Sequence, residues 1–583
     1  MILVFGGTTE GRKAVEVLDE AGSSYWYSTK TGEQDINPHH GNRIDGAMDA
    51  EAMKAFCQEH EIRLIIDAAH PFATQLHQTI ADVAEMLALP VVRYERIYPP
   101  RNPDITWIDD YSQVPTDIRT LLATTGVQSI SKLQWLERKG VKVTYRILHR
   151  DSSLVSAHQQ GATDEQLCFY EDDPMPDADA ILLKESGESG GFSEKLTEAK
   201  AKGMRIIAIK RPQLSFANRV NGPYGLRRMV EKLLPEFFPL HSGLTTGTCA
   251  TAAAVAATLR LTKGETPDEV PVLLPNGETI SVAVGYADGY AYCIKEAGDD
   301  PDVTNGIEVR ATVEEADHFE ICGGEGVGRF TLPGFDYPVG EAAINKAPRE
   351  MIRQNVEALT IHHSPLTIHH SPLAITISVP NVAAIARRTF NPRLGIEGGI
   401  SIIGVSGIVK PFSEEAFIDS IRKCMTVAQA SGTERVVINS GGKSERFVKG
   451  LYPTLPQQAF VEYGNYIGET LKIAHELNIK NVTLGVMLGK AVKLAQGHLD
   501  THSKKATMDK DFIRQLLQEA GCETDISDIT LARELWERIP ECGRIPFAQT
   551  VIRHCHKHCD ALLPNGALTI LLIDDEGKIY EAI

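Results

Sequence analysis

Along residues 1 to about 240, short apolar runs alternate with amphipathic stretches, which predicts strands followed by helices. The first run, MILVF, precedes KAVEVLDEAG, whose apolar residues recur at helical spacing. The same succession recurs at 24–29, 63–87 and 90–96, and it begins again after a proline-rich break near residue 100. Two successive arrays of this kind predict two doubly wound α/β halves that face one cleft.

Glycine-rich and polar turns follow several of these predicted strands. The first strand ends at GGTTEGR and leads into a helix, so a phosphate could approach the backbone at the helix N-terminus. The turn matches neither the dinucleotide fingerprint nor a P-loop, and a plain tight turn remains an alternative. Later strands end at Asp67-Ala68-Ala69-His70, Thr124-Thr125-Gly126 and Lys184-Glu185-Ser186-Gly187. His70 could donate a proton or only cap a helix.

The stretch Ser242 to Leu259, SGLTTGTCATAAAVAATL, predicts a helix with a hydroxyl-rich start. Alanine has the highest helix propensity, and Thr248 or Thr251 could cap the first turn. Such a start also leaves backbone N–H groups that favour an anion. On spacing alone, a small-residue helix packed against a sheet is the favoured interpretation.

Beyond this helix the pattern changes to strand-like alternation and then returns to α/β. Asn276-Gly277 is a hairpin signal between alternating runs. The acidic loop GDDPDVTNG, with Asp299 and Asp300, favours a structural or substrate-facing loop over a metal site. A helix is predicted from about Ser413 to Ser431. Strand ends at Gly441-Gly442 and Gly489-Lys490, with the DTHS segment at 500–503, predict a second ligand crevice.

Two histidine-rich tracts invite a metal interpretation, which the spacing does not favour. Residues 359–372 repeat LTIHHSP in tandem, and such a duplication is more typical of an insertion that lengthens a hairpin. The tract from His554 to Cys559 lacks a second ligand pair at zinc-finger spacing. No metal site is therefore predicted.

Composition narrows the class of partner. At 583 residues the chain should hold three or four domains, and a net charge of −18 argues against nucleic acid. It does not argue against a small anion, for which two arginine clusters are candidates. Ten scattered cysteines, no evident secretory signal and no apolar run of membrane-spanning length favour a cytoplasmic protein without a membrane partner. A homo-oligomer remains open. The two clusters are Arg93, Arg96 and Arg101, and Arg387, Arg388 and Arg393.

The segments GGTTEGR, DAAHPFA, RYERIYPP, TTG and KESG ahead of IKRP, in this order, resemble the precorrin-6A reductase family of cobalamin biosynthesis. The resemblance covers residues 1 to about 240. It implies that a reduced nicotinamide cofactor, NADPH or NADH, reduces one double bond of the precorrin-6A macrocycle. Asp67 and His70 would face the ring, with His70 the better proton donor because its unperturbed pKa is near neutrality. The implied cofactor contacts are Gly6, Gly7, Thr8, Gly11, Arg12, Thr125, Gly126, Lys184, Ser186 and Gly187.

The segments TTGTCATAAA, GDDPDVTNG, GEGVGRFTLPG, TFNPRLGIEGGISIIG, GGKSERF, GKAVKLAQG and DTHSK are similar, in order, to the cobalt-precorrin-5B C1-methyltransferase family. The similarity spans 242 to about 510, and the last seventy residues match only loosely. It implies methyl transfer from S-adenosylmethionine to a cobalt-corrinoid, with His502 as a catalytic candidate. The implied cofactor contacts are Gly441, Gly442, Glu445, Arg446, Gly489 and Lys490. The implied substrate contacts are Thr245, Thr246, Gly247, Asp299, Asp300, Arg393, Thr501 and Ser503.

Together the two resemblances predict a bifunctional enzyme of the oxygen-independent pathway, because the methylated product of one family is the substrate of the other. The expected fold class is multidomain α/β: two Rossmann-like reductase halves, an α+β segment and a further Rossmann-like segment. Two alternatives remain: a methyltransferase with a degenerate reductase half, and a cobalt or tetrapyrrole carrier built on the histidine tracts. The expected domains are 1–100, 101–240, 241–380 with an insertion at 359–372, and 381–583 with a C-terminal tail.

Overall fold

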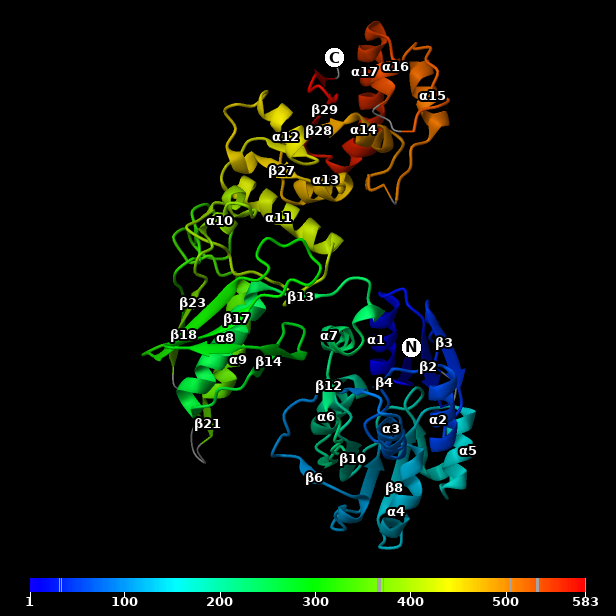
Figure 1. The fold of residues 1–583 in the computed structure, drawn as a ribbon. Helices are drawn as coiled ribbons and strands as arrows, with labels where there is room; N and C mark the ends of the chain where they lie inside the picture. Colours follow the sequence, from blue (N-terminus) through cyan, green and yellow to red (C-terminus); the bar gives the residue numbers. More distant parts are fainter. Residues whose placement is uncertain are drawn as a thin grey trace. The chain divides into compact units, whose positions relative to one another are not determined.

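The fold was described from a computed structural model. It describes residues 1–583 except 31, 33, 364–367, 371, 504, 531–533 and 582–583, and only the backbone of 361–363 and 368–370. The chain divides into two compact units (Figure 1). The first is Met1–Ser242 with Pro271–Ser281, and the second is Gly243–Val270 with Val282–Ile583. None of the helices in the described ranges combines the length and apolar character that a membrane crossing requires.

The first unit begins with a six-stranded parallel sheet whose two faces are covered by helices. Residues Ile2 and Val4 of β1 pack toward α1 and α7, whereas Leu3 and Phe5 pack toward α2 and α3. A strand buried on both faces explains the continuous apolar run MILVF. The order is β12-β5-β4-β1-β2-β3. The strands are β1 Ile2–Phe5, β2 Tyr25–Thr29, β3 Gly41–Asp45, β4 Leu64–Asp67, β5 Val91–Tyr94 and β12 Asn218–Val220; the helices are α1 Thr9–Asp19, α2 Ala50–Glu59, α3 Thr74–Leu87 and α7 Pro223–Leu233.

The last strand of this sheet comes from far along the chain. β12 pairs in parallel with β5, with Asn218 opposite Val92 and Val220 opposite Tyr94. The end of the expected second half, 101–240, therefore returns to the first sheet. The sequence gives little sign of this, because an edge strand of three residues reading NRV has no apolar run.

A second six-stranded parallel sheet completes the unit, in the order β6-β11-β10-β7-β8-β9. Leu121 and Leu182 pack on the face covered by α4 and α5, and Leu122 and Ile181 on the face covered by α6. The prediction of two parallel α/β arrays is confirmed. The strands are β6 Thr106–Ile108, β7 Thr120–Ala123, β8 Lys142–Ile147, β9 Leu167–Phe169, β10 Ala180–Lys184 and β11 Arg205–Ile209; the helices are α4 Ile130–Glu137, α5 Asp151–Gln159 and α6 Phe192–Ala201.

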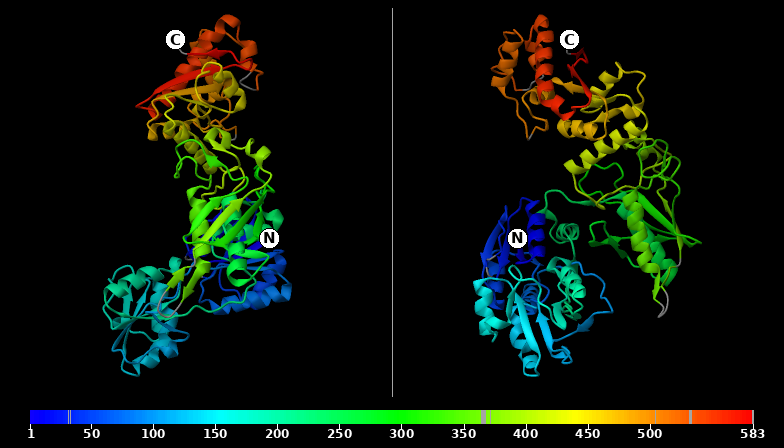
Figure 2. Two further views of the ribbon diagram at one scale, coloured as in Figure 1. Left: turned by 90° about the vertical axis from the view of Figure 1, so that its left-hand side faces the viewer. Right: turned by 180° about the vertical axis from the view of Figure 1, so that it is seen from behind.

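The second unit opens on α8, Thr246–Lys263, which lies with α9, Lys346–Thr360, along a mixed sheet (Figures 1 and 2). Every residue from Thr246 to Leu259 is buried, so the predicted packing helix is confirmed. Its cap is Thr245, not Thr248 or Thr251, because the Thr245 hydroxyl accepts from the backbone N–H of Thr248 at 3.1 Å. The sheet order is β16-β17-β18-β23-β19. These strands are β16 Gly285–Ala287, β17 Tyr290–Ile294, β18 Glu308–Glu315, β19 Glu320–Gly323 and β23 Leu373–Ser378.

Short two-stranded pairs surround this sheet. β14, Glu269–Leu273, and β15, Thr279–Ala283, form the hairpin predicted at Asn276-Gly277, with Gly277 at φ +84°. The LTIHHSP repeat places β21, Ile361–His363, antiparallel to β22, Ile368–His370, whose histidine side chains fall outside the described structure. The other pairs are β13 Gly243–Leu244 with β25 Ile408–Val409, and β20 Arg329–Phe330 with β24 Ile396–Glu397.

The remainder of the second unit is a doubly wound α/β segment, visible in yellow to red in both views of Figure 2. Its sheet order is β27-β26-β28-β29-β30, parallel except for β30. The predicted helix near 413–431 is α11, with Ser413 as its cap. The strands are β26 Val436–Asn439, β27 Phe460–Glu462, β28 Asn481–Met487, β29 Ala567–Ile573 and β30 Ile579–Tyr580; the helices are α10 Ala383–Ala386, α11 Glu414–Ala430, α12 Gly442–Lys449, α13 Ile467–Glu476, α14 Leu488–Ala495, α15 Lys510–Glu519, α16 Leu535–Arg538 and α17 Glu541–Cys559.

Candidate active sites

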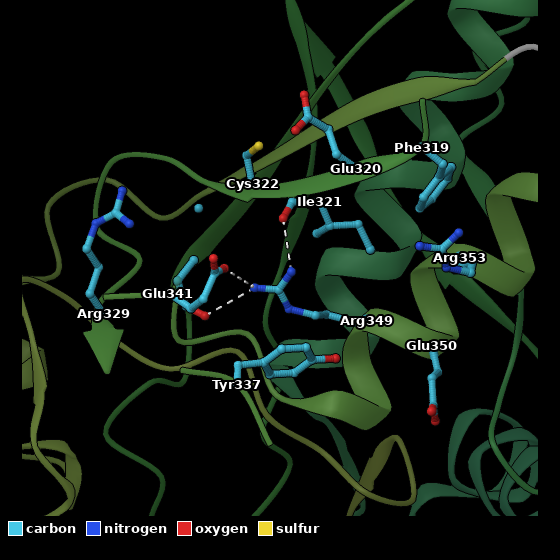
Figure 3. A pocket seen from close by; sticks show the side chains of 12 residues that line it. Phe319, Glu320, Ile321, Cys322, Arg329, Tyr337, Glu341, Arg349, Glu350 and Arg353 are labelled. Atoms are coloured by element: carbon cyan, nitrogen blue, oxygen red, sulfur yellow. Dashed lines mark hydrogen bonds and ion pairs between the residues drawn. The ribbon is translucent and has the colours of Figure 1, made fainter. Parts of the chain in front are cut away.

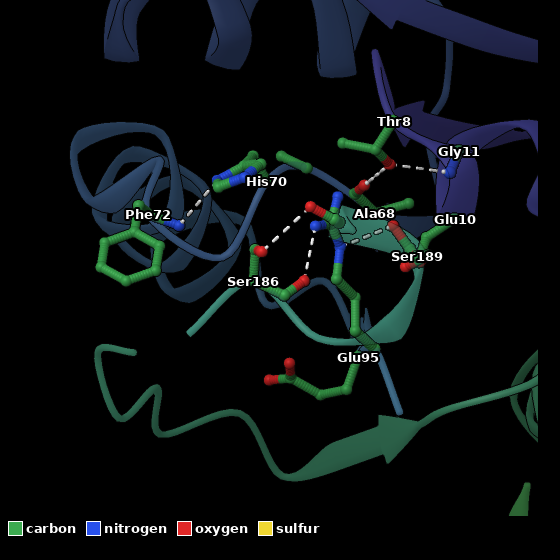
Figure 4. Close-up of polar contacts among 12 residues, drawn as sticks. Thr8, Glu10, Gly11, Ala68, His70, Phe72, Glu95, Ser186 and Ser189 are labelled. Carbon is green, nitrogen blue, oxygen red and sulfur yellow. Dashed lines mark hydrogen bonds and ion pairs between the residues drawn. The ribbon is translucent and has the colours of Figure 1, made fainter. Parts of the chain in front are cut away.

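In the first sheet the strand order reverses between β1 and β4, and the loops that follow these strands lie side by side. The Thr8 hydroxyl donates to the Ala68 carbonyl at 2.6 Å and accepts from the Gly11 N–H at 3.0 Å, which caps α1 (Figure 4). Open α/β sheets bind ligands at such a switch point. Two loops predicted from the sequence therefore meet at one place.

The three glycines of this first turn, Gly6, Gly7 and Gly11, are constrained in different ways. A Cβ at Gly6 would lie 2.1 Å from the Tyr27 hydroxyl, and one at Gly11 would lie 2.7 Å from it. Both positions are small because the Tyr27 ring packs on the turn. Gly7, at φ +84°, has open space around its Cβ position, and its N–H donates to the Tyr27 hydroxyl at 3.1 Å, so the N–H groups left for a phosphate are those of the first turn of α1. Arg12 is exposed beside this turn.

Asp67, predicted to face the ring, is instead fully buried. Its carboxylate lies 2.6 Å from His77 Nδ1 and accepts from Arg93 at 2.9 Å. Arg93 also donates to the Ala69 carbonyl at 3.0 Å, and His77 Nε2 lies 3.0 Å from the His70 carbonyl. These contacts fix the shape of the loop. His77 is absent from the sequence-based candidates, because only its fold neighbours distinguish it.

His70 is half-buried at the edge of the same loop. Burial, with the cations Arg96 and Lys184, lowers the pKa of His70 to about 3. Its Nδ1 accepts from the Phe72 N–H at 3.2 Å, which leaves the proton of the neutral ring on Nε2. The expectation of a near-neutral pKa is therefore not met. The ring is neutral at physiological pH and can donate a hydrogen bond, but it holds no extra proton to give.

The second sheet has its own switch point between β7 and β10, where the loops at Thr125-Gly126 and Lys184–Gly187 end their strands. The latter loop is held to the first half. Arg96 donates to the Ser186 carbonyl at 2.7 Å and to the Glu10 carboxylate at 2.9 Å, and Ser189 donates to the same carboxylate (Figure 4). A Cβ at Gly187 would lie 2.9 Å from the Ile97 carbonyl oxygen. The strand ends of both halves thus meet in one region.

The arginine cluster near residue 100 is committed to internal carboxylates. Arg93 pairs with Asp67, Arg96 with Glu10, and Arg101 with Glu185 at 2.8 Å. It does not offer the open anion site that composition suggested. Lys184 is a different kind of cation, half-buried at the end of β10, and its Nζ lies 5.2 Å from the centre of the Phe72 ring.

In the second unit, Thr245, Thr246 and Gly247, predicted to contact the macrocycle, are all buried. The Ile403 N–H donates to the Thr246 hydroxyl at 2.9 Å, and the Gly247 N–H donates to the Ile403 carbonyl at 2.9 Å. The hydroxyl-rich start of α8 therefore holds the loop at 401–407.

This loop exposes apolar side chains. Ile403, Val405 and Phe412 are 48%, 75% and 68% exposed. The Phe412 N–H donates to Asp300 at 3.2 Å, so the acidic loop predicted to face substrate borders this surface. Asp299 is exposed in the same acidic loop. The Ser401 hydroxyl donates to the Asn391 side chain at 3.0 Å. This bond joins the loop to the segment that precedes Asn391, in which Arg387 and Arg388 are exposed.

The doubly wound segment reverses its strand order between β26 and β28, where Gly441-Gly442 and Gly489-Lys490 follow the strands. Cβ positions at Gly442 and Gly489 are unobstructed. Glu445 pairs with Arg393 at 2.7 Å and with Lys449 at 2.7 Å, so one predicted cofactor residue and one predicted substrate residue hold each other. Arg446 lies exposed beside Phe447. Burial lowers the pKa of Lys490 to about 8, and its Nζ donates to the Gly464 carbonyl.

Glu462, at the carboxyl end of β27, is not among the site residues predicted from the sequence. Its Oε1 lies 3.4 Å from the Cβ position of Gly441. Within the described ranges no hydrogen bond or ion pair reaches its carboxylate, and burial raises its pKa. An acidic residue about twenty positions after a glycine turn, at the end of the next strand, is the ribose-binding signal of dinucleotide folds. That spacing could have found it.

The DTHS segment lies beside the loop that follows β27. The Thr501 N–H donates to the Asn465 carbonyl at 3.0 Å, and the His502 N–H donates to Asp500 at 3.0 Å. His502 is half-buried and Ser503 is exposed. The segment therefore borders the switch point.

Two other features, a cavity around Arg349 and the histidines near the C-terminus, have polar groups that are paired within the protein. A cavity of about 540 Å³ between β19 and α9 contains Arg349, which donates to the Ile321 carbonyl at 3.2 Å (Figure 3). Arg349 also donates to the Ile344 carbonyl at 3.0 Å. Its charge is satisfied within the protein. Near the C-terminus, His554 contacts Glu519 and His556 contacts Asp560, each at 2.8 Å, so these histidines serve separate carboxylates.

Comparison with known proteins agrees with this division. The family model "Precorrin-6x reductase CbiJ/CobK" matches residues 1–223, and the model "CbiD" matches residues 235–411. The model "CbiD, C-terminal domain" matches residues 500–582, so the tail belongs to this family more closely than its residues suggested.

Curated relatives cover the second region. The cobalt-precorrin-5B C(1)-methyltransferase of Prosthecochloris aestuarii is 41% identical over 349 residues, 57% of this chain and 94% of that protein. The one from Thermus thermophilus is 38% identical over 351 residues, 58% of this chain and 93% of that protein.

Two solved structures are also similar. A cobalamin biosynthesis protein (cbiD) from Archaeoglobus fulgidus is 28% identical, with a TM-score of 0.26, covering 48% of this chain and 85% of that one. CobK precorrin-6A reductase is 16% identical, with a TM-score of 0.34, covering 40% and 96%. The chain belongs to the cobalt-precorrin-5B C(1)-methyltransferase (CbiD) family and carries a precorrin-6x reductase (CbiJ/CobK) domain ahead of it.

Proposed function

We propose that this chain catalyses two consecutive steps of corrin assembly in the cytoplasm. The second unit methylates cobalt-precorrin-5B at C1 to give cobalt-precorrin-6A, and the first unit reduces that product to cobalt-precorrin-6B. The observation that carries the proposal is the presence, in one chain, of two families whose reactions follow one another, each with a switch-point loop set. Both cofactors are those that the families imply, S-adenosylmethionine and a reduced nicotinamide.

For the reductase, the residues at the first switch point fit NADPH. The first-turn N–H groups of α1, beside the open Cβ position of Gly7, would face a pyrophosphate, because the Gly7 N–H itself donates to the Tyr27 hydroxyl at 3.1 Å. Lys30 follows the end of β2, and Arg12 lies exposed beside the first turn. NAD-dependent folds carry an acidic residue near that strand end, whereas a cation there accommodates the 2′-phosphate of NADP. When bound, the nicotinamide supplies a hydride to the macrocycle.

For the methyltransferase, the β26/β28 switch point fits S-adenosylmethionine. The half-buried carboxylate of Glu462 would accept hydrogen bonds from the ribose hydroxyls, over the Gly441-Gly442 turn. Gly489 and Lys490 would form the opposite wall. When bound, the cofactor supplies a methyl group, and the protein's contribution is to hold an electron-rich ring carbon in line with it.

The loop at 401–412 fits the macrocycle. A corrinoid intermediate has an apolar ring and many carboxylates, and this loop exposes Ile403, Val405 and Phe412 near the exposed Arg387 and Arg388. Arginine is well suited to carboxylates, and apolar side chains to a ring face. Thr246 and Gly247 support this surface from beneath.

The decisive experiment supplies the purified chain with cobalt-precorrin-5B, S-adenosylmethionine and NADPH. The mass of the product should increase by one methyl group, and by two further hydrogens only when NADPH is present. A product that gains hydrogens without the methyl group contradicts the proposed order. Deleting 359–372 separates an enzyme from a histidine-based carrier, because only a carrier would lose its corrinoid.

A further inference from the structure

Lys184 is a half-buried cation at the second switch point of the reductase unit. In the part of the chain that the structure describes, its ammonium forms no hydrogen bond or ion pair, and its Nζ lies 5.2 Å from the centre of the Phe72 ring. Phe72 belongs to the loop after β4, at the first switch point. Lys184 therefore lies where the strand ends of both halves meet.

Two carboxylates at the switch points pair with arginines and not with Lys184. Glu185, the next residue, is buried and pairs with Arg101 and Arg211. Glu10 pairs with Arg96. An ammonium group that is partly removed from water without a counter-ion is costly to keep charged. Such a site suits a lysine that must release its proton.

Burial and one neighbouring cation lower the proton affinity of Lys184. That cation, Lys132, lies on α4, and His70, whose own pKa Lys184 helps to lower, lies in the loop after β4. Burial, and then Lys132, lower the pKa of Lys184 to about 8. The side chain is thus mostly protonated at neutral pH and still acidic enough to give up a proton. The neutral His70 ring beside it holds no such proton.

We propose that Lys184 is the proton donor of the reduction, an inference that rests on the proposed function of the first unit. As a hydride reaches one atom of the macrocycle double bond, the π electron pair moves to the adjoining atom. That atom takes a proton from Lys184 Nζ, so an N–H bond breaks, a C–H bond forms and a neutral amine remains. Water reprotonates the amine after the product leaves.

Two substitutions separate proton donation from charge and from cofactor binding. Lys184→Arg keeps the charge but holds its proton too tightly to donate it, and Lys184→Met removes both. Both should lower kcat/KM of the reduction by about 10²- to 10⁴-fold, the usual contribution of a general acid. NADPH affinity, followed by nicotinamide fluorescence without macrocycle, should stay within about twofold of wild type. The same titration reports whether each variant is folded.

Lys195→Met is the matched control. Lys195 is another half-buried lysine of the same half with a pKa lowered by burial, but its Nζ lies 5.1 Å from the Tyr170 ring centre and 3.5 Å from the Gly190 carbonyl oxygen. Wild type and Lys195→Met should lose kcat/KM above a pH of about 8, where Lys184 deprotonates. The Lys184 variants should lack this alkaline limb, and methylamine should restore turnover to Lys184→Ala.

Other outcomes overturn the proposal. Near-normal turnover by Lys184→Arg would assign Lys184 to charge alone. A loss of NADPH affinity that matches the loss of turnover would make it a cofactor contact. If the wild-type chain binds NADPH but never reduces the macrocycle, the proposed reductase function fails first, and the inference fails with it.

Discussion

The carboxylate of Glu278 accepts a hydrogen bond of 2.9 Å from the backbone N–H of Gly225. Gly225 lies in the first turn of α7, whose preceding residue Gly222 could not carry a Cβ, since it would lie 2.2 Å from Glu278 Oε2. Glu278 sits at the tip of the β14–β15 hairpin, also accepts from the Tyr224 N–H at 3.3 Å, and is 1% exposed. The hairpin tip thus caps the helix that packs beside α1.

Replacing Glu278 with Ala should open the start of α7. A lost N-terminal cap costs about 1–2 kcal/mol, so the amides of the first turn should exchange roughly 5- to 30-fold faster. Hydrogen-exchange mass spectrometry on peptides from 223–233 measures this. Asp288→Asn, in an exposed turn of the second unit, serves as the control. Unchanged exchange in Glu278→Ala would show that the cap contributes nothing to this helix.

Asp67→Asn should destabilise the first unit more than it changes chemistry. Removing one partner of a buried ion pair costs about 3–5 kcal/mol, and Arg93 would keep only the longer ion pair with Glu95, at 3.4 Å. Tryptophan fluorescence in urea reports this, because Trp26, Trp107 and Trp135 all lie in the first unit. Asp109→Asn, which removes an exposed pair with Lys210, should cost under about 1 kcal/mol. A stable Asp67→Asn protein with a selective loss of turnover would instead restore Asp67 as a catalytic residue.

His70 should make the first unit sensitive to acid. Its pKa is about 3 in the folded protein and about 6.5 when unfolded, so between these values only the unfolded chain binds the proton. Stability therefore falls as the pH drops from 6.5 toward 3, by up to about 1.4 kcal/mol per pH unit from this group. His70→Gln should be less acid-sensitive than wild type in urea titrations at pH 7, 6 and 5. Parallel pH dependences of the two proteins would show that His70 ionises normally.

Lys30→Asp should shift the reductase from NADPH toward NADH. A carboxylate at the end of β2 would repel the 2′-phosphate and accept from a free 2′-hydroxyl. The ratio of kcat/KM for NADPH to that for NADH should fall at least about tenfold, which corresponds to about 1.4 kcal/mol. Lys139→Asp, on the second half, is the charge-matched control. A ratio that changes equally in both variants would reflect net charge and not a phosphate contact.

Glu462→Gln should weaken S-adenosylhomocysteine in isothermal calorimetry. Hydrogen bonds to a charged acceptor contribute about 1.5–3 kcal/mol, so the expected loss is roughly 10- to 150-fold. An analogue without the ribose 2′-hydroxyl should bind wild type and variant more equally. Glu476→Gln, which removes an exposed partner of Arg422, provides the control. An unaltered dissociation constant would place the nucleoside elsewhere.

The local pattern of apolar residues is sufficient to predict those strands whose residues are buried on both faces of a sheet. Continuous apolar runs identify β1, β4 and β10, which are buried on both faces. The polar turns that follow these strands are predicted as ligand loops because ligands bind at the carboxyl ends of parallel strands. β6 and β12 are edge strands of three residues each, TWI and NRV, and runs this short show no recognisable period. They were consequently missed.

Side-chain roles were harder to predict, because they depend on partners remote in sequence. Thr246 meets Ile403, and Arg96 meets Glu10 and Ser186, across separations that no spacing rule encodes. The pKa of His70 is likewise set by burial and by cations from other elements. Glu462 is an exception among these side chains, because its role can be predicted from the number of residues that separate it from Gly441.

The hairpin tip has a consequence for the separability of the two enzymes. Pro271–Ser281 falls inside the segment matched by the CbiD model, 235–411, yet structurally it belongs to the reductase unit. A reductase cut out at residue 242 would leave the Tyr224 and Gly225 amides without their acceptor and Asn221 without the Thr279 N–H. A single cut in the chain therefore does not separate the two units completely. A reductase fragment with all of its contacts would also need residues 271–281, which lie within the methyltransferase sequence.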